Sequence, residues 1–320
     1  MKRRTLHGAL AVAAATLFFA ACAARTGLDA PEEIDAAVDV KHDVKPDVHD
    51  ASVIDVVEED SVPPIDVVFP DVPIVSDCPD AGSTFIYLLG SQNQLYSFYP
   101  PTLTATLIGK VGCTAQASPF SMAVDRQGTA YSVFTNGDLF EISTANASCK
   151  GTSYQANQLG WTTFGMGYAN IPDSGIDGGD QLFVIEVDFN QPSLGLGTID
   201  TSTFTLTKVG SFSPDLTPEC ELTGTGDGRL FALCLSQQSG STLAEIDPTS
   251  AQILGEDQLQ IGGGQEALAF AFWGGQFWIF TSPGNSTTVT RYDPGTKVET
   301  QMTTLGAQIV GAGVSTCAPQ

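Results

Sequence analysis

The stretch Phe120-Ser-Met-Ala-Val-Asp-Arg-Gln-Gly-Thr-Ala-Tyr-Ser-Val-Phe134 decides the fold of this chain. Two apolar segments flank Asp-Arg-Gln-Gly at 125–128, a composition typical of a tight turn. The stretch therefore predicts a β-hairpin. Both of its strands are expected to be buried, because their apolar residues are nearly continuous rather than alternating.

The hairpin pattern recurs along the chain. Further copies occupy residues 164–185, 220–233 and 268–280. Two half copies lie at the ends: Thr84–Gly90 has only the second strand, and Gln308–Val314 has only the first. Pairing these two end segments would supply the missing half of one repeat and remove two exposed sheet edges.

A second unit alternates with the hairpins and consists of an alternating strand that runs into a turn. Its copies begin at Leu95, Leu139, Leu196, Leu243 and Val289, with separations of 44, 57, 47 and 46 residues. Periods of about 40–50 residues with four short strands each are typical of propeller blades. The sequence predicts an all-β fold, a five-bladed β-propeller in domain 78–320.

Residues 122–131, Met-Ala-Val-Asp-Arg-x-Gly-x-Ala-Tyr, resemble the repeats of extracytoplasmic propellers of the NHL and YVTN type. The mature chain also resembles a group of predicted bacterial lipoproteins that join such a propeller to an acidic stalk. The resemblance implies the fold and the location. It implies no activity, because propellers host many functions.

Residues 1–21 are predicted to be a signal peptide. A basic segment, Met1–Arg4, precedes the apolar run Gly8–Ala21, which is too short for a membrane-spanning helix of about 20 residues. Phe19-Ala-Ala-Cys22 resembles a lipobox, in which the cysteine carries the lipid, including palmitate, after cleavage. In enterobacterial lipoproteins, which this segment resembles, an aspartate after the cysteine favours retention in the inner membrane. Ala23 stands at that place here, so the resemblance implies an outer-membrane anchor. Ordinary cleavage that releases a soluble protein is the alternative.

Residues 22–77 are predicted to form a disordered, acidic stalk behind the anchor. Asp-Val pairs recur without helical period, and Pro46, Pro63, Pro64, Pro70 and Pro73 interrupt regular structure. Like charges repel and extend such a segment. Calcium binding by its carboxylates is the alternative to a solvated spacer.

The charge of the chain argues against nucleic acid as a partner. It contains 36 acids against 13 Lys and Arg, a formal net charge of -23, whereas phosphate backbones attract basic clusters. All three histidines (His7, His42 and His49) precede the predicted propeller. Catalysis by Ser–His or Cys–His pairs and His-ligated metal chemistry are thereby excluded from the propeller.

Six cysteines follow Cys22, an even number that indicates disulfides in an exported domain. Cys220 and Cys234 are equidistant from Asp227 in a predicted hairpin turn, so they should face each other. Ring closure should bring Cys78 to Cys317, which leaves Cys113 for Cys149. A metal site is the alternative, but the sequence has no C-x-x-C spacing.

Two groups of acids are candidate sites. Asp173, Asp177 and Asp180 lie on a glycine-rich insertion and are weak candidates for binding calcium, although their spacing fits no established calcium loop. No other cofactor is predicted. Glu219 and Glu221 share one face of a strand expected near the central channel, and Glu266 occupies a comparable place one blade later.

Three tryptophans bear on ligand binding. Trp278 lies in an apolar strand and is expected in the core, whereas Trp161 and Trp273 lie near turns, where they could stack on sugars.

These observations favour a non-enzymatic binding or scaffold module that the lipid anchors in the cell envelope and that presents loops to a protein or glycan partner. A carbohydrate-active enzyme is the main alternative, and a purely structural envelope protein is a third. The paired acids of such an enzyme would be the channel carboxylates Glu219, Glu221 and Glu266.

Overall fold

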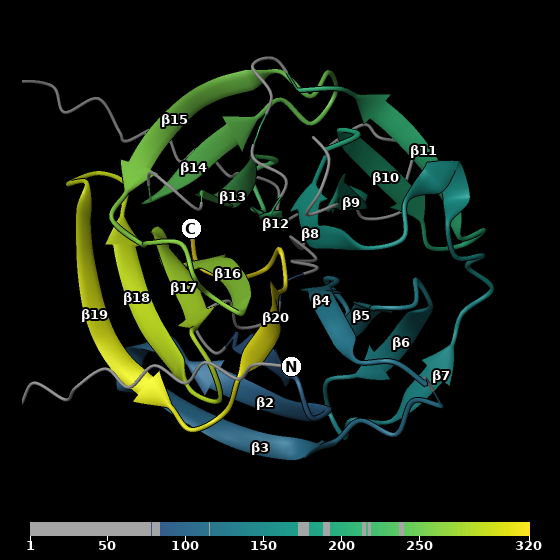
Figure 1. The fold of residues 1–320 in the computed structure, drawn as a ribbon, viewed down its shortest axis with the longest axis horizontal. Coiled ribbons are helices and arrows are strands. Elements are labelled where there is room, and N and C mark those ends of the chain that lie inside the picture. The colour runs from purple at the N-terminus through teal and green to yellow at the C-terminus, as the bar shows by residue number, and fades with distance from the viewer. Residues whose placement is uncertain are drawn as a thin grey trace, which may run out of the picture. The chain divides into compact units, whose positions relative to one another are not determined.

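The fold is a closed ring of β-sheets around a central axis (Figure 1). The computed structural model describes residues 78, 84–114, 116–171, 179–187, 193–212, 216, 219–236 and 240–320. In these residues, twenty strands form five antiparallel sheets of four strands each. The predicted five-bladed β-propeller is confirmed.

Each sheet is one blade, and its strands follow one another from the axis outward. The first sheet is β20 (Ile309–Val314), β1 (Ile86–Gly90), β2 (Gln94–Tyr99) and β3 (Thr104–Lys110); the second is β4 (Pro119–Val124), β5 (Thr129–Phe134), β6 (Leu139–Ser143) and β7 (Cys149–Gly151); the third is β8 (Phe164–Asn170), β9 (Asp180–Glu186), β10 (Leu196–Asp200) and β11 (Thr205–Gly210); the fourth is β12 (Glu219–Gly224), β13 (Leu230–Ser236), β14 (Gly240–Ile246) and β15 (Ile253–Leu259); and the fifth is β16 (Ala267–Trp273), β17 (Gln276–Ser282), β18 (Thr287–Asp293) and β19 (Val298–Leu305).

The ring closes through the first sheet, in which the last strand of the chain pairs with the first. β20 runs antiparallel to β1, with Val314 opposite Ile86 and Ala312 opposite Leu88. In Figure 1 the yellow β20 lies beside the blue strands of this sheet. The two half hairpins predicted at the ends of the repeat region therefore complete one blade, and both sheet edges are removed.

The hydrophobic core consists of five clusters, one in each seam between neighbouring blades. In one seam, for example, Phe98 of the first blade packs edge-on against Trp278 and Phe280 of the fifth, with ring centroids 5.8 and 5.6 Å apart. Because inner and middle strands contact a neighbour on each face, both faces are buried. This burial explains their nearly continuous apolar sequences.

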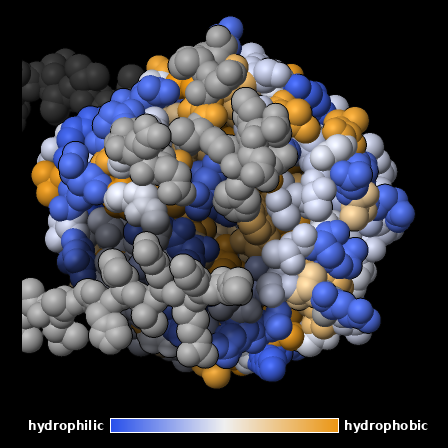
Figure 2. Space-filling view, in the orientation of Figure 1, coloured by the Kyte–Doolittle hydropathy of each residue, from blue (hydrophilic) through white to orange (hydrophobic). Residues whose placement is uncertain are grey.

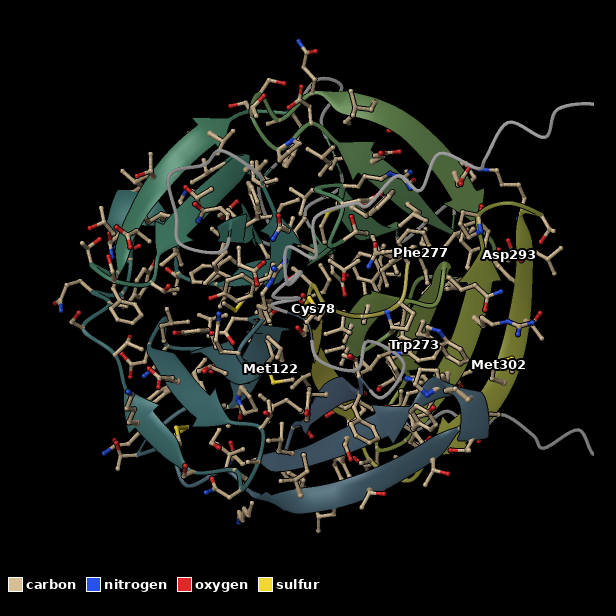
Figure 3. The ribbon with its side chains drawn as sticks, turned by 180° about the vertical axis from the view of Figure 1, so that it is seen from behind. Cys78, Met122, Trp273, Phe277, Asp293 and Met302 are labelled. Atoms are coloured by element: carbon tan, nitrogen blue, oxygen red, sulfur yellow. A yellow bond between two sulfur atoms is a disulfide. The ribbon has the colours of Figure 1, made fainter. Side chains whose placement is uncertain are left out.

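Small residues let the inner strands approach one another closely around the axis. A Cβ atom at Gly165 of β8 would lie 2.4 Å from the carbonyl oxygen of Cys220 on β12. Gly313 of β20 is equally close to β4, because a Cβ atom at Gly313 would lie 2.8 Å from the backbone nitrogen of Val124. Figure 3 labels Met122 near the centre of the ring, on the inner strand β4.

Three disulfides join parts of the ring, and they link the cysteines that the sequence analysis paired. They are Cys78–Cys317, Cys113–Cys149 and Cys220–Cys234. Cys220 and Cys234 are directly opposite in the β12–β13 ladder. Three disulfides in one domain are typical of exported proteins, which fold in an oxidising compartment.

The predicted signal peptide, Cys22 and the stalk to residue 77 lie outside the described residues. No helix among the described residues has the length and apolar character needed to cross a membrane.

Candidate functional site

One end of the central channel opens into a cavity of about 270 Å³, here called the channel mouth. It lies where the inner strands begin, and it is lined by Glu219 and Glu221 of β12 and by Glu266, which directly precedes β16. The structure thus brings all three candidate channel carboxylates into one cavity. Two neighbouring blades supply them.

Glu221 is the deepest of the three acids and is 7% exposed. The Ser121 hydroxyl on β4 donates a hydrogen bond of 2.6 Å to its Oε2 atom, and the Met166 amide on β8 donates one of 3.1 Å to Ser121 Oγ. Burial raises the pKa of Glu221 well above its ordinary value, although the Ser121 hydrogen bond opposes the shift. Burial at the base of the mouth therefore shifts this carboxyl toward its protonated form.

The other two acids lie nearer to solvent. Glu219 is half-buried, and burial raises the pKa of its carboxyl. The charge of Glu219 contributes, after burial, to the raised pKa of Glu221. Glu266 is exposed, and the Gln308 side-chain amide donates a hydrogen bond of 3.1 Å to its Oε2 atom.

The remaining wall of the mouth combines apolar side chains with hydroxyl groups. Phe120, Leu268 and Val310 supply apolar surface, and no lysine or arginine is among the described residues that line the cavity. Figure 2 shows one face of the ring hollowed near its centre, with hydrophobic and hydrophilic residues side by side around the hollow. A ligand in the mouth would therefore meet carboxyl groups and apolar surface together.

Sequence reasoning missed Ser121, the residue that holds Glu221. Its place between apolar neighbours on β4 identified it as part of a buried strand. Nothing in the sequence linked it to an acid 100 residues away.

At the opposite end of the inner strands, residues 315–320 lie near the hairpin turns of the fourth and fifth blades and near a cluster around Asp180. Asp180 accepts hydrogen bonds from the Arg126 amide at 2.9 Å and the Thr316 hydroxyl at 2.7 Å. It also forms an ion pair of 3.5 Å with Arg126. These contacts tie the second and third blades to residues that follow β20.

The calcium candidates share this region only in part. Asp180 has the partners just described, whereas Asp173 and Asp177 lie outside the described residues. Among the residues whose positions are given, no group of three His, Cys, Asp or Glu side chains could hold a metal ion. The calcium site stays a prediction.

The three tryptophans have different environments. Trp278 is 4% exposed and lies in the core, as its apolar strand predicted. Trp161, whose role the sequence left undecided, is 1% exposed and packs in the seam between the second and third blades, so it has no free face for a sugar. Trp273 is half-buried, and its indole N–H donates a hydrogen bond of 2.7 Å to the Thr84 carbonyl.

No family model matches the sequence, and no curated protein matches it either. Solved structures do resemble the fold. A chain of the nidogen/laminin complex is 10% identical, with a TM-score of 0.48 over 73% of this chain and 99% of that one. A protein of unknown function from Bacteroides caccae is 11% identical, with a TM-score of 0.39 over 72% and 98% of the two chains. TolB from Acinetobacter baumannii is 13% identical, with a TM-score of 0.40 over 71% and 55%. These similarities are too low to carry an argument about function.

Proposed function

We propose that this chain is an exported envelope lipoprotein whose propeller binds a cationic group of a partner at the channel mouth and catalyses no reaction. The observation that carries the proposal is the composition of the mouth: three glutamates, apolar side chains, and no lysine or arginine among its described lining residues. An ammonium or guanidinium group on an apolar stem complements both features.

The size of the mouth limits the ligand. Pockets for drug-sized ligands span roughly 300–1,000 Å³, and the mouth at about 270 Å³ lies below that range. One side chain or a small amine fits such a volume better than an oligosaccharide. A basic side chain of a partner protein is therefore the ligand class that we infer.

Glycoside hydrolysis needs one protonated acid and one ionised carboxylate at a set separation. Burial raises the pKa of both Glu219 and Glu221, and that of Glu221 well above its ordinary value. A bound cation would favour ionisation of both, because opposite charge lowers the pKa of a carboxyl.

Export and anchoring support a role at the cell envelope. The basic and apolar segments before Cys22 are typical of a bacterial lipoprotein signal, and three disulfides agree with an oxidising compartment. Attachment to the outer membrane is part of the proposal.

Titration of the full chain with arginine amide and lysine amide tests the ligand class. We expect weak binding that falls as salt rises and that the double variant Glu219→Gln/Glu266→Gln abolishes. Asp200→Asn, at an exposed aspartate of β10 that does not line the mouth, is the matched control and should bind as the wild type does. Equal binding by the double variant would overturn the proposal.

The same preparation tests the enzymatic alternative. The specific observation in its favour is the raised pKa of Glu221 inside a cavity. Release of reducing sugar from a polysaccharide panel, lost in Glu221→Gln, would favour a carbohydrate-active enzyme. Retention without turnover, or no interaction at all, would count against it.

A further inference from the structure

A second cavity, of about 580 Å³, lies in the seam between the fourth and fifth blades and is here called the seam groove. It contacts Phe272 and Gly275 near the end of β16, whereas the channel mouth contacts Ala267 and Leu268 at the start of that strand. The groove and the mouth therefore lie on opposite faces of the ring. Nothing in the sequence analysis identified the groove.

The groove is open because Gly255, which has no side chain, lies opposite residues with large side chains on the neighbouring strands. In the ladders of the fourth blade, Phe231 is opposite Glu245, and Glu245 is opposite Gly255. Side chains opposite each other lie on the same face of a sheet, so the row ends in a gap at the outermost strand. A Cβ atom built on Gly255 meets no heavy atom within 4 Å.

The floor of the groove is apolar and comes from both blades. Phe231 and Leu243 belong to the fourth blade, and Phe272 and Phe277 belong to the fifth. Phe231 packs edge-on against Phe277, with ring centroids 4.8 Å apart. Phe277 and Asp293 of the fifth blade are labelled in Figure 3, which shows the ring from behind.

The walls of the groove are lined by charged residues, which form two ion pairs. Arg229 pairs with Glu245 at 2.8 Å, and its guanidinium lies 4.8 Å from the centroid of the Phe231 ring. Lys297 of the fifth blade pairs with Asp257 of the fourth at 2.6 Å.

Asp257 keeps its charge at neutral pH. Burial opposes ionisation, but hydrogen bonds from Lys297 and Tyr292 lower the pKa of its carboxyl. With Asp227 and Glu256 also on the lining, the groove has four carboxylates against two cations. An excess of negative charge therefore borders an apolar floor.

We propose that the seam groove binds a peptide segment in which a basic side chain is next to an apolar one. The carboxylate excess selects a cation by charge complementarity, and the floor of phenylalanine and leucine offers apolar contact to the neighbouring side chain. The volume lies within the range of roughly 300–1,000 Å³ that ligand pockets span. A neutral saccharide carries no charge to complement the excess carboxylates, and a phosphate-bearing ligand would be repelled.

This site does not depend on the function proposed for the channel mouth. Because the two sites lie on opposite faces, the ring could hold two partners at once. Such an arrangement would make the propeller a bridge between them.

Peptide selection on the purified full chain tests the proposal. Random peptides displayed on phage are panned against the wild type, and the affinities of enriched peptides are then measured for two variants. Gly255→Leu places a side chain in the groove where a built Cβ meets nothing within 4 Å. Gly151→Leu is the matched control, since Gly151 also lies on an outermost strand, β7, with nothing within 4 Å of a built Cβ.

We expect enriched peptides to combine lysine or arginine with apolar residues and to bind the control as tightly as the wild type. Gly255→Leu should weaken them at least about tenfold, a loss of about 1.4 kcal/mol. Glu256→Lys, a charge reversal at an exposed position, should also weaken them and provides a second variant if Gly255→Leu does not fold.

Three results would overturn the proposal. The first is that no peptide is enriched, and the second is that enriched peptides bind Gly255→Leu and Glu256→Lys as they bind the wild type. The third is that cellohexaose or maltohexaose binds the wild type but not Gly255→Leu, which would assign the groove to a saccharide.

Discussion

Ser121 and Glu221 are 100 residues apart in the chain, and their side chains meet in the channel at 2.6 Å between Ser121 Oγ and Glu221 Oε2. The contact joins the inner strands of the second and fourth blades, which are the two neighbours of the third blade. It holds a carboxyl group where burial favours its protonated form. The first prediction follows from this arrangement.

The free energy of unfolding should fall less steeply with rising pH in Glu221→Gln than in the wild type. The folded-state pKa is raised, so the unfolded chain loses this proton at lower pH than the folded chain does. Stability from this group is complete below the ordinary value of 4.5 and is lost as pH rises toward the folded-state pKa. The slope is up to about 1.4 kcal/mol per pH unit.

Urea unfolding of the wild type and Glu221→Gln between pH 5 and pH 8 measures this difference. Glutamine resembles the protonated carboxyl, so the variant should lose less stability across the range. Glu256→Gln, at an exposed site, is the control and should behave as the wild type does. Parallel curves for wild type and Glu221→Gln would contradict a protonated Glu221.

The Cys78–Cys317 disulfide should make a large contribution to stability, because it closes a loop with a sequence separation of 239. On the chain-entropy model, a crosslink over a loop of that size stabilises the fold by about 5 kcal/mol before strain is subtracted. Cys317→Ser should therefore lower the midpoint of chemical unfolding strongly. Peptide mapping without reductant should recover Cys78 bound to Cys317, and recovery of Cys78 bound to Cys113 would contradict the ring closure.

Gly165→Ala should destabilise the ring, because the new methyl group would lie 2.4 Å from the Cys220 carbonyl oxygen. Overpacking of this kind costs about 1–3 kcal/mol. Thermal melting compares it with Gly151→Ala, where a built Cβ has no neighbour within 4 Å. Equal melting temperatures for the two variants would show that the inner strands can separate without cost.

Cys22 is expected to carry lipid. Cells grown with a fatty-acid probe should label the wild type but not Cys22→Ala, since the thiol is the attachment point in lipoproteins of this kind. Total expression of the two forms, measured on the same gel, is the control. Equal labelling of the wild type and Cys22→Ala would contradict lipid attachment at Cys22.

The acidic segment 26–77 is expected to be dispensable for folding. Its repeated Asp-Val pairs and prolines offer little surface for a core. Limited proteolysis of the full chain should trim this segment and leave a resistant core that begins near Cys78. A protected fragment that begins well upstream would show that the segment packs on the propeller.

The elements that depend on local pattern are predictable from the sequence. The stretch 120–134 is a hairpin of β4 and β5, and the copies at 220–233 and 268–280 are hairpins as well. Their apolar runs and turn residues lie next to each other in the chain, so pattern alone identifies them. Trp161 could not be assigned in this way, because its burial depends on Leu206 and Phe164 in the next blade.

By itself, the sequence determined the number of repeats and the similarity of the hairpins, because strand period, turn chemistry and repeat spacing are local properties. It also indicated how the ring closes, because each end of the repeat region carries only half a hairpin. It also placed the three glutamates at the channel, since register within a strand follows from alternation. Only the tertiary structure decided that Ser121 holds Glu221 and that Lys297 reaches Asp257. It alone decided that Gly255 leaves a groove open. Each of these depends on which residues of different strands or blades face one another, and that is set by the packing of whole sheets around the axis.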